Sequence, residues 1–226
     1  MRRSFARELM DGPVDDVDEL AANLRDIAFA NAHLGGTAPV VRALRRIDAP
    51  RLSLLDVGSG AGDVAVALAH DASRRGVELH VTCLDQSEQM LAIARAATGG
   101  AATFAFVRAD GGALPFADGA FDIVTCTLAL HHFDPSDARA MLRELRRVAR
   151  VAPVVCDLRR SALGFALTWL WSRTSGNRLT RHDAPLSVRR AYTPSEAIAL
   201  ARGAGWLAPQ VRREPFFRMT LTDSAA

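Results

Sequence analysis

Apolar residues in the middle of this chain fall into short continuous runs, separated by stretches with helical spacing. The runs are rich in Val, Leu, Ile, Cys and Phe, and they predict buried strands at 52–56, 79–84, 103–107, 121–128 and 152–156. Between them, the spacing predicts helices that begin near Asp63, Ser87 and Pro135. Strands that alternate with helices in this way predict an α/β fold with a parallel sheet and right-handed crossovers.

The chain departs from this alternation on both sides of the strand-rich core. Ahead of it, residues 17–34 have apolar positions at helical spacing, and a second helix begins at Thr37-Ala38-Pro39. These two helices either complete the core or cover a ligand. After the core, residues 161–171 are apolar and aromatic, and residues 172–190 form a polar, arginine-rich connection.

The C-terminal residues add one helix and one hairpin. Thr193-Pro194-Ser195-Glu196 is typical of a helix N-terminus, and Gly203-Ala204-Gly205 ends that helix. Two β-like runs within residues 209–222 are separated by Glu214-Pro215, which predicts an antiparallel hairpin at the sheet edge. No linker is long enough to divide the chain, so we expect a single domain over residues 1–226.

A glycine-rich turn follows the first strand, with the pattern D-x-G-x-G-x-G at Asp56, Gly58, Gly60 and Gly62. Glycine allows the backbone to take positive φ and lets a ligand lie against bare main chain. A dinucleotide fingerprint would require glycine where Asp63 stands, and a pyrophosphate would be repelled by that acid. The turn therefore predicts a nucleotide-type ligand other than a dinucleotide.

Polar residues gather where the predicted strands end. Ligands of open α/β sheets bind outside the carboxyl ends of the strands. The residues at those ends are Asp56, Asp85, Asp110, His131 and Asp157. We therefore expect their side chains to converge on one site.

Composition narrows the classes of function. The chain has 226 residues, is 49% hydrophobic and carries a net charge of +3, and all of its 28 basic residues are arginine. Without lysine, a phosphate-binding P-loop and Schiff-base catalysis are both excluded. The arginines are dispersed and form no stripe with interleaved aromatic residues, which argues against nucleic-acid binding.

Cysteine usage and hydropathy bear on the compartment. Cys83, Cys126 and Cys156 each lie in an apolar run without CxxC spacing, as buried thiols do in a reducing compartment. The first residues do not resemble a secretory signal. The longest apolar run, 162–171, is shorter than the roughly 20 residues that span a bilayer. We expect a cytoplasmic protein without a membrane span.

Four segments carry a resemblance to a known family: LLDVGSGAGD, LDQSEQML, RADGGALPFADGAFDIVTC and LALHHF. Together they resemble the class I S-adenosylmethionine-dependent methyltransferases, and within these the ubiquinone/menaquinone-type group. The match covers residues 52–157. It implies a single Rossmann-like methyltransferase domain with a mostly parallel seven-stranded sheet, an antiparallel C-terminal hairpin strand and S-adenosyl-L-methionine as cofactor. In that reading residues 1–50 are a helical cap, 51–157 the cofactor-binding core, and 158–226 the acceptor-side helices and hairpin.

The resemblance also implies roles for individual residues. Asp56 and the glycine backbone would hold the methionine end of the cofactor, and Asp85 would accept both ribose hydroxyls. Asp110 with Gly111 would receive the adenine amino group, and Thr127-Leu128 would line the site beside the sulfonium. The cofactor-binding residues implied in this way are Asp56, Gly58, Ser59, Gly60, Gly62, Asp85, Gln86, Asp110, Gly111, Thr127 and Leu128.

His131 and His132 are the candidate catalytic residues. They follow the fourth strand, where the transferred methyl group is expected, and histidine is a suitable base for a hydroxyl acceptor near neutral pH. We expect one ring to face the pocket and its neighbour to point away. The alternative is that these histidines only shape the pocket wall. His182 and Tyr192 are further candidates for the base.

The acceptor is less defined than the cofactor. We expect no metal, because the carboxylates and cysteines lack the spacing of a metal site. Phe165, Trp169 and Trp171 are candidates for an apolar acceptor pocket. The interpretation is a small-molecule methyltransferase of secondary metabolism that acts on a phenol, quinol or polyketide-like compound, on oxygen or, as the second choice, on carbon. The alternatives are a protein or nucleic-acid methyltransferase, a non-catalytic S-adenosylmethionine-binding protein and, with least support, an NAD-dependent dehydrogenase.

Overall fold

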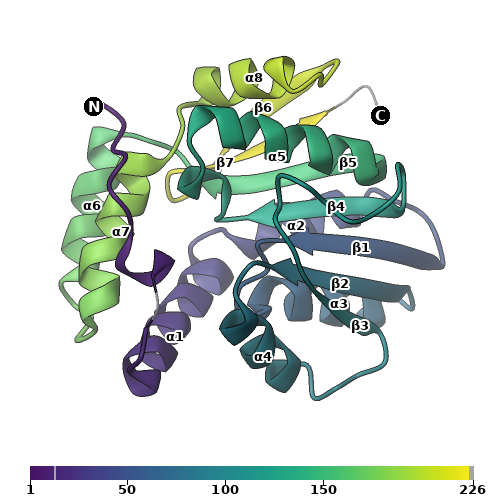
Figure 1. The fold of residues 1–226 in the computed structure, drawn as a ribbon, viewed down its shortest axis with the longest axis horizontal. Coiled ribbons are helices and arrows are strands. Elements are labelled where there is room, and N and C mark those ends of the chain that lie inside the picture. Colours follow the sequence, from purple (N-terminus) through teal and green to yellow (C-terminus); the bar gives the residue numbers. More distant parts are fainter. Residues whose placement is uncertain (13, 224–226) are drawn as a thin grey trace.

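The computed structural model describes residues 1–12 and 14–223, and its centre is a seven-stranded sheet in the order β3-β2-β1-β4-β5-β7-β6 (Figure 1). The strands are β1 (Arg51–Val57), β2 (Glu78–Asp85), β3 (Phe104–Arg108), β4 (Phe121–Thr127), β5 (Ala149–Leu158), β6 (Pro209–Glu214) and β7 (Arg218–Asp223). The first five strands are parallel, and β7 pairs antiparallel with both β5 and β6. The predicted Rossmann-like sheet with a C-terminal hairpin is confirmed.

Helices cover both faces of the sheet. The helices α2 (Thr37–Leu44), α3 (Asp63–Arg74) and α4 (Glu88–Ala97) contribute their buried apolar residues to one core cluster. On the opposite face, α5 (Pro135–Val148) and α8 (Pro194–Gly203) contribute to a second cluster. The parallel strands β1 and β4 are buried on both sides, which explains their continuous apolar runs.

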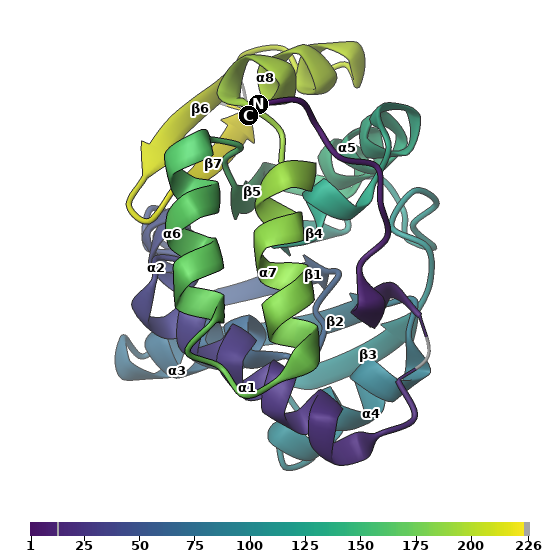
Figure 2. The ribbon, with the colours of Figure 1, turned by 90° about the vertical axis from the view of Figure 1, so that its left-hand side faces the viewer.

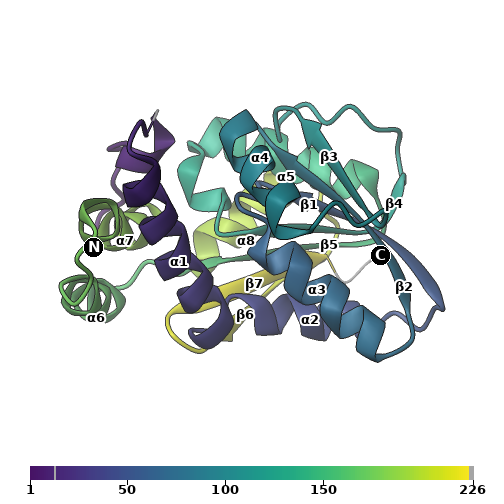
Figure 3. The same ribbon diagram turned by 90° about the horizontal axis from the view of Figure 1, so that it is seen from below.

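Three helices lie beyond the carboxyl ends of the parallel strands. Figure 2 shows α1 (Val17–His33), α6 (Ala162–Ser172) and α7 (Arg178–Arg190) in front of those strand ends, and Figure 3 shows the same three helices gathered at one end of the molecule. Two short 3₁₀ turns, Leu9–Asp11 and Leu130–His132, lie among them. This layer covers the edge at which an open α/β sheet binds its ligands.

The polar segment 172–190 was expected to be a connection, and this expectation is wrong. Residues Arg178–Arg190 form α7, with Asn177 as the N-cap that accepts a hydrogen bond from the Thr180 N–H. Half of its buried residues are polar, and these four, Thr180, Asp183, Ser187 and Arg190, recur at helical spacing. A search for apolar periodicity does not detect such a helix, and Pro185 inside it argues further against one.

No helix among the residues that the structure describes has the length and apolar character needed to cross a membrane.

Candidate active site

A cavity of about 950 Å³ opens at the carboxyl ends of β1, β2 and β4, beneath α1, α6 and α7. The glycine turn after β1 forms one side of it, and the two histidines after β4 form another. The strand-end residues that the sequence placed together therefore do meet, with the exceptions given below.

The glycine turn has the backbone geometry that its sequence predicts. Gly58, Gly60 and Gly62 have φ values of 69°, 53° and 79°, which L side chains rarely adopt. A Cβ on Gly58 would lie 2.8 Å from the Cβ of Ala129, whereas at Gly60 there is open space. Glycine at position 58 is thus required by contact with the loop after β4, and at position 60 by the backbone conformation.

Asp85 fixes this turn from the neighbouring strand. Its Oδ2 accepts a hydrogen bond from the Gly60 N–H at 2.9 Å, and its Oδ1 accepts one from the Ser87 N–H at 2.9 Å. One carboxylate at the end of β2 therefore connects the glycine turn to the start of α4.

Asp56 is buried at the end of β1, with 2% of its surface exposed. Burial and, to a lesser extent, the negative charges of Asp63 and Asp85 raise the pKa of its carboxyl to about 7, although a hydrogen bond from the Thr125 hydroxyl opposes the rise. Three carboxylates close to one turn make the site favourable for a cationic ligand.

A polar side-chain atom in the cavity wall makes no hydrogen bond within the described part of the chain. Thr127 Oγ1 is buried and has no hydrogen-bond partner among the described residues, although it lines the cavity. The next residue, Leu128, has φ of 54°, an unfavourable conformation for leucine. A polar, positively charged ligand without phosphate fits this end of the cavity, and S-adenosylmethionine has those properties.

Nine of the eleven predicted cofactor residues line the cavity: Asp56, Gly58, Ser59, Gly60, Asp85, Gln86, Gly111, Thr127 and Leu128. Gly62 and Asp110 do not. Gly62 instead packs against Ala94 of α4, where a Cβ would lie 3.1 Å from the Ala94 side chain. Asp110 is exposed, and its carboxylate accepts a hydrogen bond from the Gly112 N–H at 2.8 Å. The structure does not bring its side chain to the cavity wall.

His131 and His132 lie side by side, with ring centroids 4.3 Å apart, and both line the cavity. The expectation that one ring points away is wrong, because Leu130–His132 is a 3₁₀ turn rather than a strand with alternating side chains. His131 Nδ1 is 2.7 Å from Asp157 Oδ1, and His132 Nδ1 is 2.7 Å from Asp11 Oδ1. Each ring is therefore oriented by a carboxylate on its Nδ1 side.

These carboxylates are held in their ionised forms. Burial alone would raise the pKa of Asp157, but the charge and hydrogen bond of His131 outweigh it and lower that pKa. Burial likewise opposes ionisation of Asp11, but the hydrogen bond from His132 and the charges of His132 and Arg190 lower its pKa to about 2.

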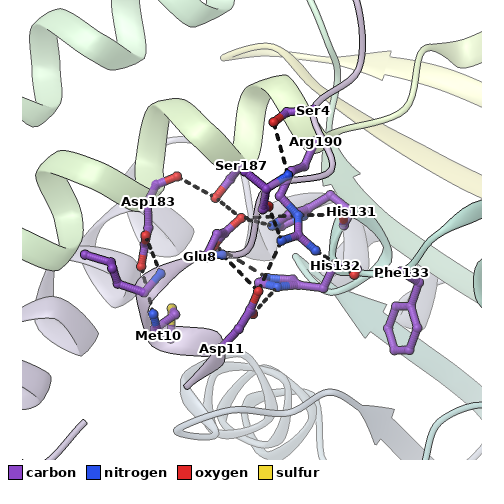
Figure 4. Close-up of polar contacts among 12 residues, drawn as sticks. Ser4, Glu8, Met10, Asp11, His131, His132, Phe133, Asp183, Ser187 and Arg190 are labelled. Atoms are coloured by element: carbon purple, nitrogen blue, oxygen red, sulfur yellow. Dashed lines mark hydrogen bonds and ion pairs between the residues drawn. The ribbon is translucent and has the colours of Figure 1, made fainter. Parts of the chain in front are cut away.

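Glu8 faces both imidazoles from the N-terminal segment (Figure 4). It is 4% exposed, and burial raises the pKa of its carboxyl to about 7, with partial compensation from the charge of His132. Ser187 of α7 donates its hydroxyl hydrogen to Glu8 Oε1 at 2.9 Å. The sequence did not predict a role for Glu8, because its partners His131 and His132 are more than 120 residues away and the residues around Glu8 form no recognisable motif.

Arg190 and Asp183 of α7 hold this segment in place. Arg190 donates to the Ala6 carbonyl at 2.7 Å, the His132 carbonyl at 2.6 Å and Asp11 Oδ2 at 3.1 Å. Asp183 accepts hydrogen bonds from the backbone N–H groups of residues 9 and 10. The sequence analysis did not single out Arg190 or Asp183. The signal that could have found them is the recurrence of polar residues at helical spacing along α7.

The aromatic residues proposed for the acceptor pocket, and the two further candidates for the base, do not all line the same cavity. Trp171 lines the cavity, whereas Phe165 and Trp169 line a second hollow beside α6 and α7. His182 lies in that second hollow as well. Tyr192 is buried outside the cavity lining and donates its hydroxyl to the Phe133 carbonyl at 2.7 Å, and burial raises its pKa to about 12. The structure thus gives no support to His182 or Tyr192 as the base.

Comparison with known proteins agrees with this geometry. Residues 54–151 match the family model described as "Methyltransferase domain". A demethylmenaquinone methyltransferase from Thermus thermophilus is 42% identical over 169 residues, covering 68% of this chain and 73% of the relative. The ubiquinone/menaquinone biosynthesis C-methyltransferase UbiE of Methylobacterium nodulans is 28% identical over 223 residues, covering 89% of this chain and 87% of the relative.

A solved structure supports the fold over nearly the whole chain. A SAM-dependent methyltransferase from Aquifex aeolicus superposes with a TM-score of 0.63 at 17% sequence identity, covering 92% of this chain and 98% of that one. Together with the glycine turn, the carboxylates around it and the sheet order, these similarities show that the chain belongs to the class I S-adenosylmethionine-dependent methyltransferases of the ubiquinone/menaquinone type.

Proposed function

We propose that this methyltransferase acts on a small, largely apolar acceptor with a hydroxyl group, such as a phenol, a quinol or a polyketide-like compound, and methylates its oxygen. The observation that carries the proposal is that two carboxylate-bound histidines, the glycine turn and an extensive apolar wall line one cavity.

The apolar wall suits an acceptor of this kind. It comes from α1, α6, the end of β5 and the β6–β7 turn, and its residues are Leu20, Leu24, Ile27, Leu34, Leu158, Leu167, Trp171, Phe216 and Phe217. Burial of a ring system against such a surface contributes about 25 cal/mol per Å² of apolar area. That α1 supplies part of this wall supports a cap over the acceptor for the α1 part of residues 1–50, whereas α2 packs into the core on one face of the sheet.

The proposed cofactor residues are those implied by the family resemblance, with Asp56, Asp85 and the glycine turn at their centre. S-adenosylmethionine supplies an electrophilic methyl group for displacement by a lone pair of the acceptor. The protein's part is to hold the two reactants in line, which can contribute on the order of 7–11 kcal/mol.

His131 is the proposed base. Because the ionised Asp157 accepts from its Nδ1, the Nε2 atom retains a lone pair that can take the proton of the acceptor hydroxyl. Asp157 then stabilises the resulting imidazolium, as the carboxylate does in other carboxylate–histidine pairs. His132, oriented in the same way by Asp11, helps to position the acceptor.

Methylation of a ring carbon is the second candidate, and the names of two relatives favour it. The Methylobacterium nodulans relative is named as a C-methyltransferase of ubiquinone/menaquinone biosynthesis, and the Thermus thermophilus relative as a demethylmenaquinone methyltransferase. Loss of the proton from a phenolic hydroxyl activates the neighbouring ring carbons as well as the oxygen. The same histidine would therefore serve either reaction.

The test uses S-adenosylmethionine with a radiolabelled methyl group, the purified protein and an extract of the cells that produce it. Label in the solvent-extractable fraction supports a small-molecule acceptor, and analysis of the labelled product distinguishes an O-methyl from a C-methyl group. Label in the acid-precipitable fraction would move the acceptor to protein or nucleic acid and overturn the proposal. His132→Ala should spare cofactor affinity, and loss of cofactor binding in this variant would contradict the role given to His132.

A further inference from the structure

Glu8, His131 and His132 surround a small space on the cavity wall, and we refer to these three residues as the Glu8–histidine cluster (Figure 4). His131 Nε2 lies 3.6 Å from Glu8 Oε1, and His132 Nε2 lies 3.8 Å from Glu8 Oε2. Both distances are too long for hydrogen bonds. We infer that this cluster binds a divalent transition-metal ion such as Zn²⁺ through two imidazole nitrogens and one carboxylate.

The hydrogen bonds on the far side of each imidazole are those of a metal-binding histidine. Asp157 and Asp11 each accept from an Nδ1 atom at 2.7 Å, which leaves the Nε2 lone pairs directed at the space beside Glu8. Histidines that ligate metals almost always donate their other ring N–H to a carboxylate, a carbonyl or water. The Glu8 carboxylate has its own support from the Ser187 hydroxyl at 2.9 Å.

The separations between donor atoms are close to those of an occupied site. Ligand atoms at about 2.1 Å from Zn²⁺ in tetrahedral geometry are about 3.4 Å from one another. The two measured separations, 3.6 and 3.8 Å, exceed this by a few tenths of an ångström. The donor atoms of all three residues lie within 4.8 Å of one another, so the three side chains must move closer together when they bind an ion.

The charge around the cluster favours a divalent cation. Three carboxylates, those of Glu8, Asp11 and Asp157, contact the two imidazoles. Two guanidiniums lie beside them, that of Arg190 and that of Arg3, which donates to the His131 carbonyl at 3.2 Å. Arg190 is directed mainly at backbone carbonyls and Asp11, and its Nε is 3.9 Å from Glu8 Oε1. With neutral imidazoles the net charge of this group is negative, and an ion of charge +2 compensates it.

The donor set also selects the class of metal. Imidazole nitrogen suits Zn²⁺, Fe²⁺, Co²⁺ and Ni²⁺, whereas Mg²⁺ and Ca²⁺ prefer sites made of oxygen. Three protein ligands leave coordination positions open, as in catalytic rather than structural sites. All three ligands line the large cavity, so the open positions would face the proposed acceptor site. An ion bound to His131 Nε2 occupies the lone pair that the proposed base uses, so the bound ion would block that base. The inference itself concerns binding of the ion and does not depend on the identity of the acceptor.

The expectation of a metal-free protein rested on the sequence spacing of cysteines, histidines and acids. Two of the three ligands are adjacent in the sequence, and the third belongs to a segment whose position depends on Arg190 and Asp183 of α7. A site assembled in this way has no local sequence signature.

The test is titration of the full-length, chelator-treated protein with Co²⁺ and with Zn²⁺, followed by calorimetry and, for Co²⁺, by visible absorption. We expect one ion per chain, displacement of Co²⁺ by Zn²⁺, and no competition from Mg²⁺. Glu8→Gln and His131→Ala should each weaken Zn²⁺ binding by more than 100-fold. Asp157→Asn should weaken it by about 10- to 100-fold, because it changes the orientation and tautomer of His131.

The matched control is His80→Ala, which removes an exposed histidine that also lies beside a glutamate, Glu78, at the opposite end of the sheet. Its Zn²⁺ affinity should equal that of the parent protein. Glu8→Gln keeps the size and shape of the side chain, and its binding of S-adenosylhomocysteine reports that the protein is folded. Failure of the parent protein to bind Zn²⁺, or binding that Glu8→Gln leaves unchanged, overturns the inference. Methyl transfer that proceeds in either case leaves the proposed function standing.

Discussion

Asp157 binds His131 twice: its Oδ2 accepts the His131 backbone N–H at 2.9 Å, and its Oδ1 lies 2.7 Å from the ring Nδ1. Asp157 is at the end of β5 and His131 in the turn after the neighbouring strand β4, so this contact joins adjacent carboxyl ends of the sheet. One buried carboxylate thus fixes both the position of the turn and the tautomer of the imidazole.

Substitution of Asp157 by asparagine should lower the rate of methyl transfer while leaving the cofactor bound. The asparagine amide can donate to Nδ1 and so reverse the tautomer, which puts a proton on the Nε2 atom that must accept one. General base catalysis contributes typically 10²- to 10⁴-fold, so we expect kcat to fall by at least about 100-fold. Rates with the acceptor identified by labelling, together with titration of S-adenosylhomocysteine, check this.

Asp122→Asn is the matched control for that variant. Asp122 lies near the opposite end of β4 and accepts hydrogen bonds from Ser53. Its substitution should leave kcat unchanged. An Asp157→Asn enzyme that turns over at the parent rate would contradict the role of the Asp157–His131 pair.

The second prediction concerns the connection between Asp85 and the glycine turn. Asp85→Ala removes the acceptor of the Gly60 and Ser87 N–H groups as well as the proposed ribose contact. Hydrogen bonds to a charged group are worth about 1.5–3 kcal/mol, so cofactor affinity should fall by about 10- to 100-fold. Calorimetric titration with S-adenosylhomocysteine measures this, with Glu78→Ala at the start of the same strand as a control that should bind normally.

The third prediction follows from the raised pKa of Asp56. Because this pKa is about 7 in the folded protein and near 4 in the unfolded chain, the folded state keeps a proton that the unfolded state loses between these pH values. The free energy of unfolding therefore falls as pH rises through this window. Asp56→Asn, which cannot ionise, should be more stable than the parent at pH 8, by as much as about 4 kcal/mol at 1.36 kcal/mol per pKa unit.

Denaturant unfolding at pH 5 and pH 8 checks this. The difference in free energy of unfolding between Asp56→Asn and the parent should be much smaller at pH 5. The cofactor affinity of Asp56→Asn should fall at the same time, because the variant loses the negative charge proposed to face the methionine end. Asp122→Asn should change the free energy of unfolding in the opposite direction. The pKa of Asp122 is lowered in the folded protein, so its ionised form stabilises the fold, and this substitution should reduce stability at pH 8. If Asp56→Asn were the less stable protein at pH 8, burial would not be the dominant effect on Asp56.

The central part of the fold could be predicted because its signals are local. The apolar runs of β1 and β4 are buried on both faces, and the glycine turn is specified by three positive φ values within five residues, Gly58 to Gly62. Most cofactor residues then follow from their positions at the strand ends. Gly62 and Asp110 are the exceptions: Gly62 packs against Ala94, and the Asp110 carboxylate turns back to the Gly112 N–H, outside the cavity lining.

The acceptor side could not be predicted in the same way, because it depends on contacts between distant segments. Glu8 meets the histidines only because α7 holds residues 6 to 11 through Asp183 and Arg190. The helix α7 was itself missed, since its buried face is polar where it meets this segment and the cavity. Local periodicity carries no information on such contacts.

The last prediction concerns Gly58, where the glycine turn touches the loop after β4. Gly58→Ala places a methyl group in a backbone with φ of 69° and 2.8 Å from the Ala129 Cβ, so both strain and a clash result. Gly76 has nearly the same φ, 71°, but a Cβ there meets nothing within 4 Å, so Gly76→Ala carries the backbone cost alone. We expect Gly76→Ala to cost about 1 kcal/mol and Gly58→Ala about 1–3 kcal/mol more, from overpacking. Denaturant unfolding of both variants measures the difference, and S-adenosylhomocysteine titration should show weaker binding for Gly58→Ala alone. Equal stability of the two variants would mean that the glycine turn and the loop of Ala129 separate freely, and that their contact does not shape the cofactor site.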